Sequence, residues 1–242
     1  MSNDQLLNEA LEAISALRSE GAHVHSITNT VAQNFTANVL LACNATVSMT
    51  ANHAEIESFV LNTEALHINL GTIDDGRIEA IKKAVAIAEK NSMPVSLDPV
   101  MIHISGQRRQ LALEIATVAR IVRGNARETD ALGNSVDDDT CLVKTGGIDE
   151  VWMADRKVGV KNGHPLLGRV IATGCALGAL ISALSAKTDD PFTAGLAGVL
   201  WFATAGEFAA QAVDGPGSFQ PAFIDQLHAI PTETIRQMAE IS

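Results

Sequence analysis

The chain has 242 residues, of which 47% are hydrophobic and 19% are charged, and its 17 basic and 28 acidic residues give a net charge of −11. This composition indicates a globular chain rather than a disordered one, and a chain of this length can bury a sizeable core. An acidic chain without a basic cluster repels a phosphate backbone, so we expect no nucleic acid among its partners.

The cysteines and the apolar stretches indicate the cellular compartment of the protein. Cys43, Cys141 and Cys175 include no CxxC pair, so neither a disulfide framework nor a zinc site is favoured, and a reducing compartment is expected. The acidic start MSNDQLLNEALEAI is unlike a signal peptide. Two uncharged stretches, 170–186 and 191–206, fall just short of a membrane span and predict closely packed core helices. We therefore expect a cytoplasmic protein with no membrane partner.

The order of the predicted elements indicates the fold. Hydrophobic spacing predicts helices at 4–18 and 31–43 and a short strand at 45–49. Strands at 65–72, 94–100, 120–125 and 141–146 then alternate with helices at 74–90, 109–119 and 126–132. A β-hairpin at 151–153 and 157–160 follows, and then helices at 173–186, 191–212 and 222–240. This pattern predicts an α/β fold in which helices flank both faces of a mainly parallel sheet. No linker or repeat divides residues 1–242, so we expect one domain.

Polar groups follow every strand of the predicted sheet. Because ligands bind outside the carboxyl ends of parallel strands, these groups are expected to converge at one edge. Asn125 and Glu128 lie three residues apart at a helix start and, with Asp98, can hold Mg²⁺ through water molecules. The alternative is a capping box, in which Asn125 caps the helix and Glu128 is its partner.

A second candidate site lies at the start of the helix that opens with Thr173, Gly174 and Cys175. Helix N-termini bind anions, and Gly174 allows an anion to approach the backbone. The same field is expected to lower the pKa of Cys175 and make it available as a base or nucleophile. The alternative is a small buried thiol. Neither a GxGxxG motif nor a P-loop occurs in the sequence.

The segment HSITNTVAQNFTAN at 25–38 strongly resembles the N-terminal signature of hydroxyethylthiazole kinases, which belong to the ribokinase-like superfamily. Later strings occur in the order of that family: NLGT at 69–72, LDPV at 97–100, RGNARE at 123–128, a Gly-Cys helix start and GPGSF at 215–219. The resemblance covers almost the whole chain and implies a ribokinase-like three-layer fold.

The resemblance also implies an activity. It suggests an ATP- and Mg²⁺-dependent kinase that phosphorylates the hydroxyl of 5-(2-hydroxyethyl)-4-methylthiazole in thiamine salvage. Cys175 matches the cysteine that stands where many relatives carry an aspartate base. Residues on the ATP side would be Arg123, Thr145, Asn125 and Gly174, and Asp98 and Glu128 look like the magnesium-side carboxylates. The thiazole pocket would be lined by Met49, Asn29, Thr28, Gly71, Thr72 and Ala172. A homotrimer with active sites between subunits is implied as well.

Several positions depart from the family pattern. Met101 and His103 replace glycines after the LDPV string, and Ala172 and Ile171 stand where glycine and threonine are expected. The lost glycines are expected to reshape the anion site, because glycine adopts positive φ angles most readily. The chain also looks shortened, with a helix missing near 133–140. These departures leave two alternatives open: a kinase for another small heterocyclic alcohol, or a catalytically weakened protein that binds a thiazole or a nucleotide.

Overall fold

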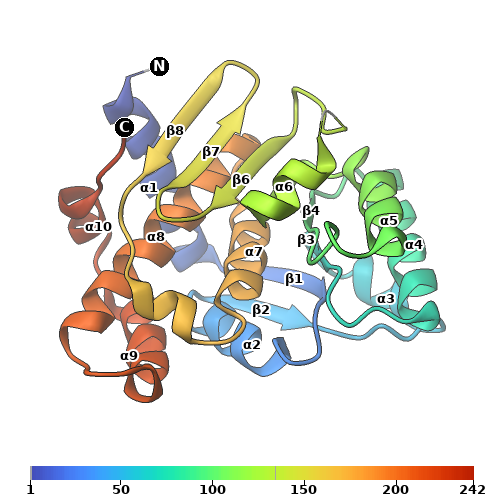
Figure 1. The fold of residues 1–242 in the computed structure, drawn as a ribbon, viewed down its shortest axis with the longest axis horizontal. Coiled ribbons are helices and arrows are strands. Elements are labelled where there is room, and N and C mark those ends of the chain that lie inside the picture. Colours follow the sequence, from blue (N-terminus) through green and yellow to red (C-terminus); the bar gives the residue numbers. More distant parts are fainter. Residues whose placement is uncertain (1, 134) are drawn as a thin grey trace.

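The computed structural model describes residues 2–133 and 135–242, which form a mixed sheet of eight strands with helices on both faces (Figure 1). The order across the sheet is β2-β1-β3-β4-β5-β6-β7-β8. The strands are β1 (Ala22–Ile27), β2 (Ala45–Ser48), β3 (Ala65–Asn69), β4 (Val95–Asp98), β5 (Ile121–Asn125), β6 (Cys141–Thr145), β7 (Asp149–Met153) and β8 (Arg156–Val160). Neighbouring strands from β2 to β6 are parallel, and β7 and β8 extend the sheet as an antiparallel hairpin. The prediction of a mainly parallel α/β sheet is confirmed.

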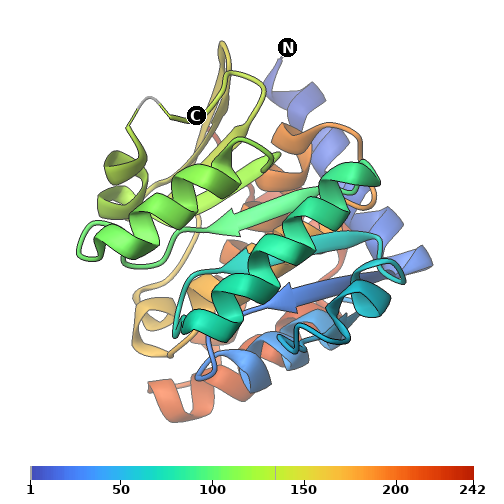
Figure 2. The same cartoon turned by 90° about the vertical axis from the view of Figure 1, so that its right-hand side faces the viewer.

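The helices divide between the two faces, and each set shares its own hydrophobic core. One core contains side chains of α1 (Asn3–Glu20), α2 (Gln33–Ala42), α7 (Thr173–Leu184), α8 (Pro191–Gln211), α9 (Pro216–Ala229) and α10 (Thr232–Met238). The other contains side chains of α3 (Ile56–Val60), α4 (Asp75–Lys90), α5 (Gly106–Ala116) and α6 (Ala126–Leu132). Figure 2 shows α4 and α5, in teal and green, in front of the sheet and the blue and orange helices behind it.

Helices α7 and α8 are the most deeply buried. Every residue of α7 from Ala176 to Leu184 is buried, and so is every residue of α8 from Phe192 to Gly206. Among the described residues, α8 alone is long and apolar enough to cross a membrane, but 89% of its apolar window is buried inside the fold. The prediction that both uncharged stretches form core helices is confirmed.

The sequence prediction was wrong or incomplete at several elements. Strand β1 was not among the predicted strands, and two of its polar residues, His25 and Ser26, are fully buried and hydrogen-bonded to Ser48 and His67. The short helix α3 was not predicted, and α5 lies three residues earlier than expected. The helix predicted at 222–240 is two helices, α9 and α10. Helix α9 starts at Pro216, six residues before the predicted start and inside the GPGSF string.

The segment between α6 and β6 is short. Helix α6 provides the crossover between the parallel strands β5 and β6. Of the residues that follow, Gly133 and 135–140 belong to no helix or strand, which agrees with the expected shortening. Position 134 lies outside the described residues.

Candidate active site

The carboxyl ends of the parallel strands meet at one edge of the sheet, as predicted. The last residues of β3 and β4, Asn69 and Asp98, are register partners, and so are Asn125 and Thr145 at the ends of β5 and β6. Parallel pairing in this register puts the chemically active side chains of four strands next to one another.

Arg123 lies against the N-terminus of α7. Its Nη2 donates a hydrogen bond to Oγ1 of Thr145 at 2.9 Å. A Cβ placed on Gly174 would lie 2.6 Å from both Nη1 and Nη2, so only a glycine lets the guanidinium come this close to the helix. Nε of Arg123 is buried and has no hydrogen-bond partner among the described residues. A guanidinium beside the positive end of a helix dipole is electrostatically unfavourable unless an anion lies between them. This arrangement is typical of a phosphate site.

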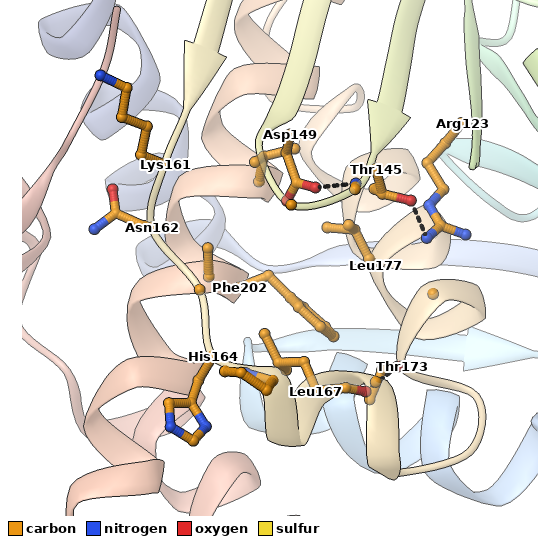
Figure 3. A pocket seen from close by; sticks show the side chains of 18 residues that line it. Arg123, Thr145, Asp149, Lys161, Asn162, His164, Leu167, Thr173, Leu177 and Phe202 are labelled. Carbon is orange, nitrogen blue, oxygen red and sulfur yellow. Dashed lines mark hydrogen bonds between the residues drawn. The ribbon is translucent and has the colours of Figure 1, made fainter. Parts of the chain in front are cut away.

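A cavity of about 460 Å³ opens beside Arg123 (Figure 3). Its walls come from the turn between β6 and β7, from the segment between β8 and α7, and from one face of α8. Apolar side chains, Leu167, Leu177, Val199 and Phe202, supply part of the lining. Its polar and glycine positions are Arg123, Thr145, Gly146, Gly147, Asp149, Lys161, Asn162, Gly163, His164, Gly168, Thr173 and Gly174. The volume and the mixed lining suit a small organic ligand with an anionic end.

Asp149 lines this cavity and was missed by the sequence reading. Its Oδ1 accepts a hydrogen bond from the backbone N–H of Gly146 at 2.8 Å and so holds the turn between β6 and β7 (Figure 3). Burial raises the pKa of the Asp149 carboxyl, although the Gly146 hydrogen bond and the charge of Arg123 oppose the shift. No motif spacing singles out this residue, because its role depends on the hairpin turn.

Asp98 and Asn69 form a buried polar pair beneath the site. Nδ2 of Asn69 donates to Oδ2 of Asp98 at 3.0 Å, and Oδ1 of Asn69 accepts from the N–H of Gly71 at 2.9 Å. Both side chains are almost fully buried. Oδ1 of Asp98 has no hydrogen-bond partner among the described residues. Asn69 therefore links Asp98 to the Gly71 loop, a role that was not predicted from the sequence.

The prediction of a lowered pKa for Cys175 was wrong. Burial raises the pKa of its thiol to about 11, and the negative charge of Asp98 adds to the increase. Asn69 and Arg123 oppose this effect but do not overcome it. The field at the helix start can be inferred from the sequence, but the loss of water around the thiol depends on tertiary packing and outweighs that field. Cys175 is therefore a neutral thiol at pH 7 in this state of the protein.

Asn125 and Glu128 form the capping box that was the alternative to a metal site. Oδ1 of Asn125 accepts from the N–H of Glu128 at 3.1 Å, and Oε2 of Glu128 accepts from the N–H of Asn125 at 3.0 Å. Oε1 of Glu128 also accepts from the N–H of Met101 at 3.0 Å. Glu128 thus joins the β4–α5 loop to the start of α6.

The carboxylates fit a magnesium ion that keeps most of its waters. No cluster of three His, Cys, Asp or Glu side chains within 2–133 and 135–242 could enclose a metal. Asp98 nevertheless has a free buried oxygen, and each oxygen of Glu128 keeps a lone pair beyond its backbone hydrogen bond. Mg²⁺ commonly binds in this way, through one or two carboxylates, water and substrate phosphates.

The predicted acceptor-side residues follow β1, β2 and β3, except Ala172, which immediately precedes α7. The side chain of Asn29 packs directly on Gly71, and the hydroxyl of Thr72 donates to Oδ1 of Asn29 at 3.5 Å. Thr28 is buried beside Asn29, and Met49 directly follows β2, the edge strand that pairs with β1. The structure therefore brings Asn29, Gly71 and Thr72 into contact. None of the acceptor-side residues, Ala172 included, lines the cavity beside Arg123.

Two residues that stand where glycine is expected, Met101 and Ala172, have positive φ angles. Met101 has a φ of 62° and Ala172 a φ of 71°, so both occupy the left-handed region that glycine favours. Both residues therefore keep a backbone conformation that glycine adopts readily, although each adds a side chain at that position. His103 lies in the same loop and is exposed.

The sequence and the fold of this chain are similar to those of known hydroxyethylthiazole kinases. The model of the hydroxyethylthiazole kinase family matches residues 14–138 and 134–233. A probable hydroxyethylthiazole kinase of Agrobacterium fabrum is 38% identical over 233 residues, which cover 96% of this chain and 94% of that protein. The solved structure of a hydroxyethylthiazole kinase protein from Pyrococcus horikoshii superposes with a TM-score of 0.92 at 33% identity, over 97% of this chain and 98% of the other.

A more distant structure bears on the fold alone. A ribokinase-like superfamily protein of Enterococcus faecalis superposes with a TM-score of 0.61 at 14% identity, over 96% of each chain. The ribokinase-like fold expected from the sequence is therefore confirmed. With the family match extending over most of the described residues, the chain belongs to the hydroxyethylthiazole kinase family.

Proposed function

We propose that this protein transfers the γ-phosphoryl group of ATP to the hydroxyl of 5-(2-hydroxyethyl)-4-methylthiazole, as in thiamine salvage. The observation that carries the proposal is the position of Arg123 against Gly174 at the start of α7, beside a cavity of about 460 Å³. Two positive groups face one another there, and a triphosphate supplies the missing negative charge. The names of the relatives supply the acceptor.

The nucleotide side follows from these contacts. Arg123 and Thr145 bind phosphate oxygens, and Asn125 keeps Glu128 in place through the capping box. The free backbone N–H groups around Gly174 hold the transferring phosphoryl group, where its charge is spread over three oxygens. This assignment predicts that Arg123 variants weaken nucleotide binding before they affect the acceptor.

The carboxylates Asp98 and Glu128 are proposed to hold Mg²⁺ through water. When bound, the metal ion neutralises phosphate charge. Asn69 fixes one oxygen of Asp98, and the other oxygen, Oδ1, is buried beside Gly178 of α7 without a hydrogen-bond partner among the described residues. Asp98 is therefore oriented before any ligand arrives, so no energy is spent on ordering it during the reaction.

Cys175 is proposed to contact the acceptor hydroxyl, and its thiolate form, a minor fraction at pH 7, to receive the hydroxyl proton late in the transfer. With the thiol pKa raised to about 11, little thiolate exists at pH 7, so the base role makes a small contribution. Phosphoryl transfer through a loose transition state needs positioning and charge neutralisation more than proton abstraction. We expect Cys175 to matter mainly for kcat and little for thiazole affinity.

The acceptor side is proposed to be completed by a second subunit of a homotrimer. In one chain, the residues expected to line the thiazole pocket do not line the cavity beside Arg123. Exposed apolar side chains are present for such a contact, among them Val31 after β1 at 59% and Phe59 of α3 at 38% exposure. We further propose that residues 1–242 act as one kinase domain in the cytoplasm. Sedimentation equilibrium tests the trimer, and a monomer that retains full activity would contradict it.

A coupled assay tests the activity. ADP production is measured with ATP, Mg²⁺ and the thiazole alcohol, against a blank without acceptor and a panel of other heterocyclic alcohols. We expect ADP formation that depends on the thiazole. Faster turnover of another alcohol would favour the alternative acceptor, which the exposed Met101 in the altered loop motivates. No ADP above the blank, from folded protein that binds the thiazole, would contradict kinase activity.

A further inference from the structure

The segment 161–164 forms the wall of the cavity on the side away from Arg123 (Figure 3). We infer that Glu207 of α8 is a positioning residue for nucleotide binding, because it holds this wall together with the C-terminal segment 238–242. The inference rests on the proposed function, since it takes the cavity as the nucleotide site. Glu207 does not line the cavity itself.

Both carboxylate oxygens of Glu207 accept hydrogen bonds from the segment 161–164. Oε1 accepts a hydrogen bond from the backbone N–H of Gly163 at 2.8 Å, and Oε2 accepts from Nδ2 of Asn162 at 3.2 Å. Glu207 is one helical turn after Ala203, which lines the cavity, on the mostly buried helix α8. The segment 161–164 is therefore fixed to α8, the helix whose face also lines the cavity.

Asn162 is the junction between the wall and the C-terminal segment. Its side chain is 6% exposed, and Nδ2 also donates to the carbonyl oxygen of Met238 at 2.8 Å. Its Oδ1 accepts from the N–H of Glu240 at 2.8 Å. Both amide hydrogens and the amide oxygen are engaged, and Figure 3 shows the side chain directed away from Arg123. Asn162 therefore positions backbone rather than binding a ligand.

The C-terminal segment pairs with the outer edge of β8 and continues to the wall. Gly159 and Ser242 exchange two backbone hydrogen bonds of 2.9 Å, and the N–H of Lys161 donates to the carbonyl oxygen of Glu240 at 2.9 Å. This pairing covers an edge that would otherwise expose free backbone groups. The wall is consequently held from α8 on one side and from the C-terminal segment on the other.

Gly163 makes the wall sensitive to the loss of Glu207. Its φ of 133° lies in a region that side chains rarely adopt, so its N–H points at Glu207 only while the wall keeps this conformation. Glu207→Gln keeps the shape of the side chain but replaces an accepting oxygen with a donating NH₂ group, which then faces another donor. We expect the wall to shift and the nucleotide to lose contacts.

The test compares Glu207→Gln with Asp190→Asn. Asp190 also connects α8 with β8, through two bonds to Arg156, but it lies at the other end of α8, away from the cavity. For Glu207→Gln we expect an ADP dissociation constant and a KM for ATP that rise about tenfold, with kcat and the KM for the thiazole within about twofold. Asp190→Asn is expected to lower Tm but to leave ADP affinity within about twofold.

Two results would overturn the inference alone: folded Glu207→Gln protein that binds ADP as tightly as wild type, or Asp190→Asn protein that loses as much affinity. A wild-type protein that binds no ADP would instead refute the proposed nucleotide site, and the inference with it. If Glu207→Gln does not fold, the positioning role is tested by amide hydrogen exchange on the wild-type protein. Saturating ADP should slow exchange at Lys161 and Gly163, and unchanged rates there would refute the positioning role.

Discussion

Gly174→Ala is expected to damage the phosphate site without destabilising the protein. The added methyl group would lie 2.6 Å from Nη1 and Nη2 of Arg123 and 2.9 Å from Cζ. Favourable contacts between such atoms lie at roughly 3.5–4.0 Å. Since the guanidinium is the far end of a flexible side chain, it can move away at little cost to the fold, and it would leave the position in which it bonds Thr145.

The size of the effect follows from the contact that is lost. The hydrogen bond from Nη2 of Arg123 to Thr145 is 2.9 Å long. Without that bond the guanidinium loses its position toward the phosphate, and a hydrogen bond from a guanidinium to a phosphate oxygen is worth about 1.5–3 kcal/mol, so kcat/KM for ATP should fall by about 10- to 150-fold. Loss of the intramolecular bond to Thr145 costs about 0.5–1.5 kcal/mol net, and alanine is a better helix former than glycine by about 1 kcal/mol, so the free energy of unfolding should change by no more than about 0.5 kcal/mol.

A double-mutant cycle with Arg123→Ala provides the assay. If Gly174 acts by making room for the guanidinium, Gly174→Ala should cost little once Arg123 is already alanine. Gly106→Ala is the matched control, because Gly106 opens α5 and no atom lies within 4 Å of a Cβ placed there. Unchanged ATP kinetics in Gly174→Ala, or an equal loss in both backgrounds, would refute the role of this contact.

Three further predictions concern Cys175, His25 and Met101. Cys175→Ala should lower kcat with little change in the KM for the thiazole. Because burial raises the thiol pKa to about 11, alkylation of Cys175 should still accelerate above pH 9, and a plateau by pH 8 would contradict this. Burial lowers the pKa of His25 to about 4, below the usual value of 6.5, so the unfolded chain binds a proton that the native state rejects. Stability should therefore fall by about 2–3 kcal/mol between pH 6.5 and pH 4, and urea unfolding of His25→Gln should lack this fall. Met101→Gly should raise the free energy of unfolding by about 0.5 kcal/mol, because relief of about 1–2 kcal/mol of left-handed strain exceeds the entropy cost of glycine. A loss above about 1 kcal/mol by thermal unfolding would contradict it.

The strands and their shared edge could be predicted because they depend on local patterns. Alternating strands and helices imply a parallel sheet, and its carboxyl edge then collects Asp98, Arg123 and Thr145 whatever the packing details. The capping box at Asn125 and Glu128 is equally local, since it depends on a spacing of three residues.

What could not be predicted depends on tertiary environment. Strand β1 was not predicted, and the partners that allow its polar His25 to be buried, Ser48 and Thr50, come from tertiary contacts that the sequence does not reveal. The pKa of Cys175 was predicted in the wrong direction, because burial outweighs the field of the helix end. Asn69 was overlooked because its importance comes from contacts with Asp98 and Gly71 across neighbouring elements.

The most direct test of phosphoryl transfer is a ³¹P NMR spectrum of wild-type protein with ATP, Mg²⁺ and 5-(2-hydroxyethyl)-4-methylthiazole, recorded beside Arg123→Ala. We predict a growing phosphomonoester signal that matches the loss of the γ-phosphate signal, and a much slower conversion by the variant. Loss of the γ-phosphate to inorganic phosphate alone would contradict transfer to the thiazole alcohol. Equal rates in both proteins would contradict the phosphate site at Arg123 and α7.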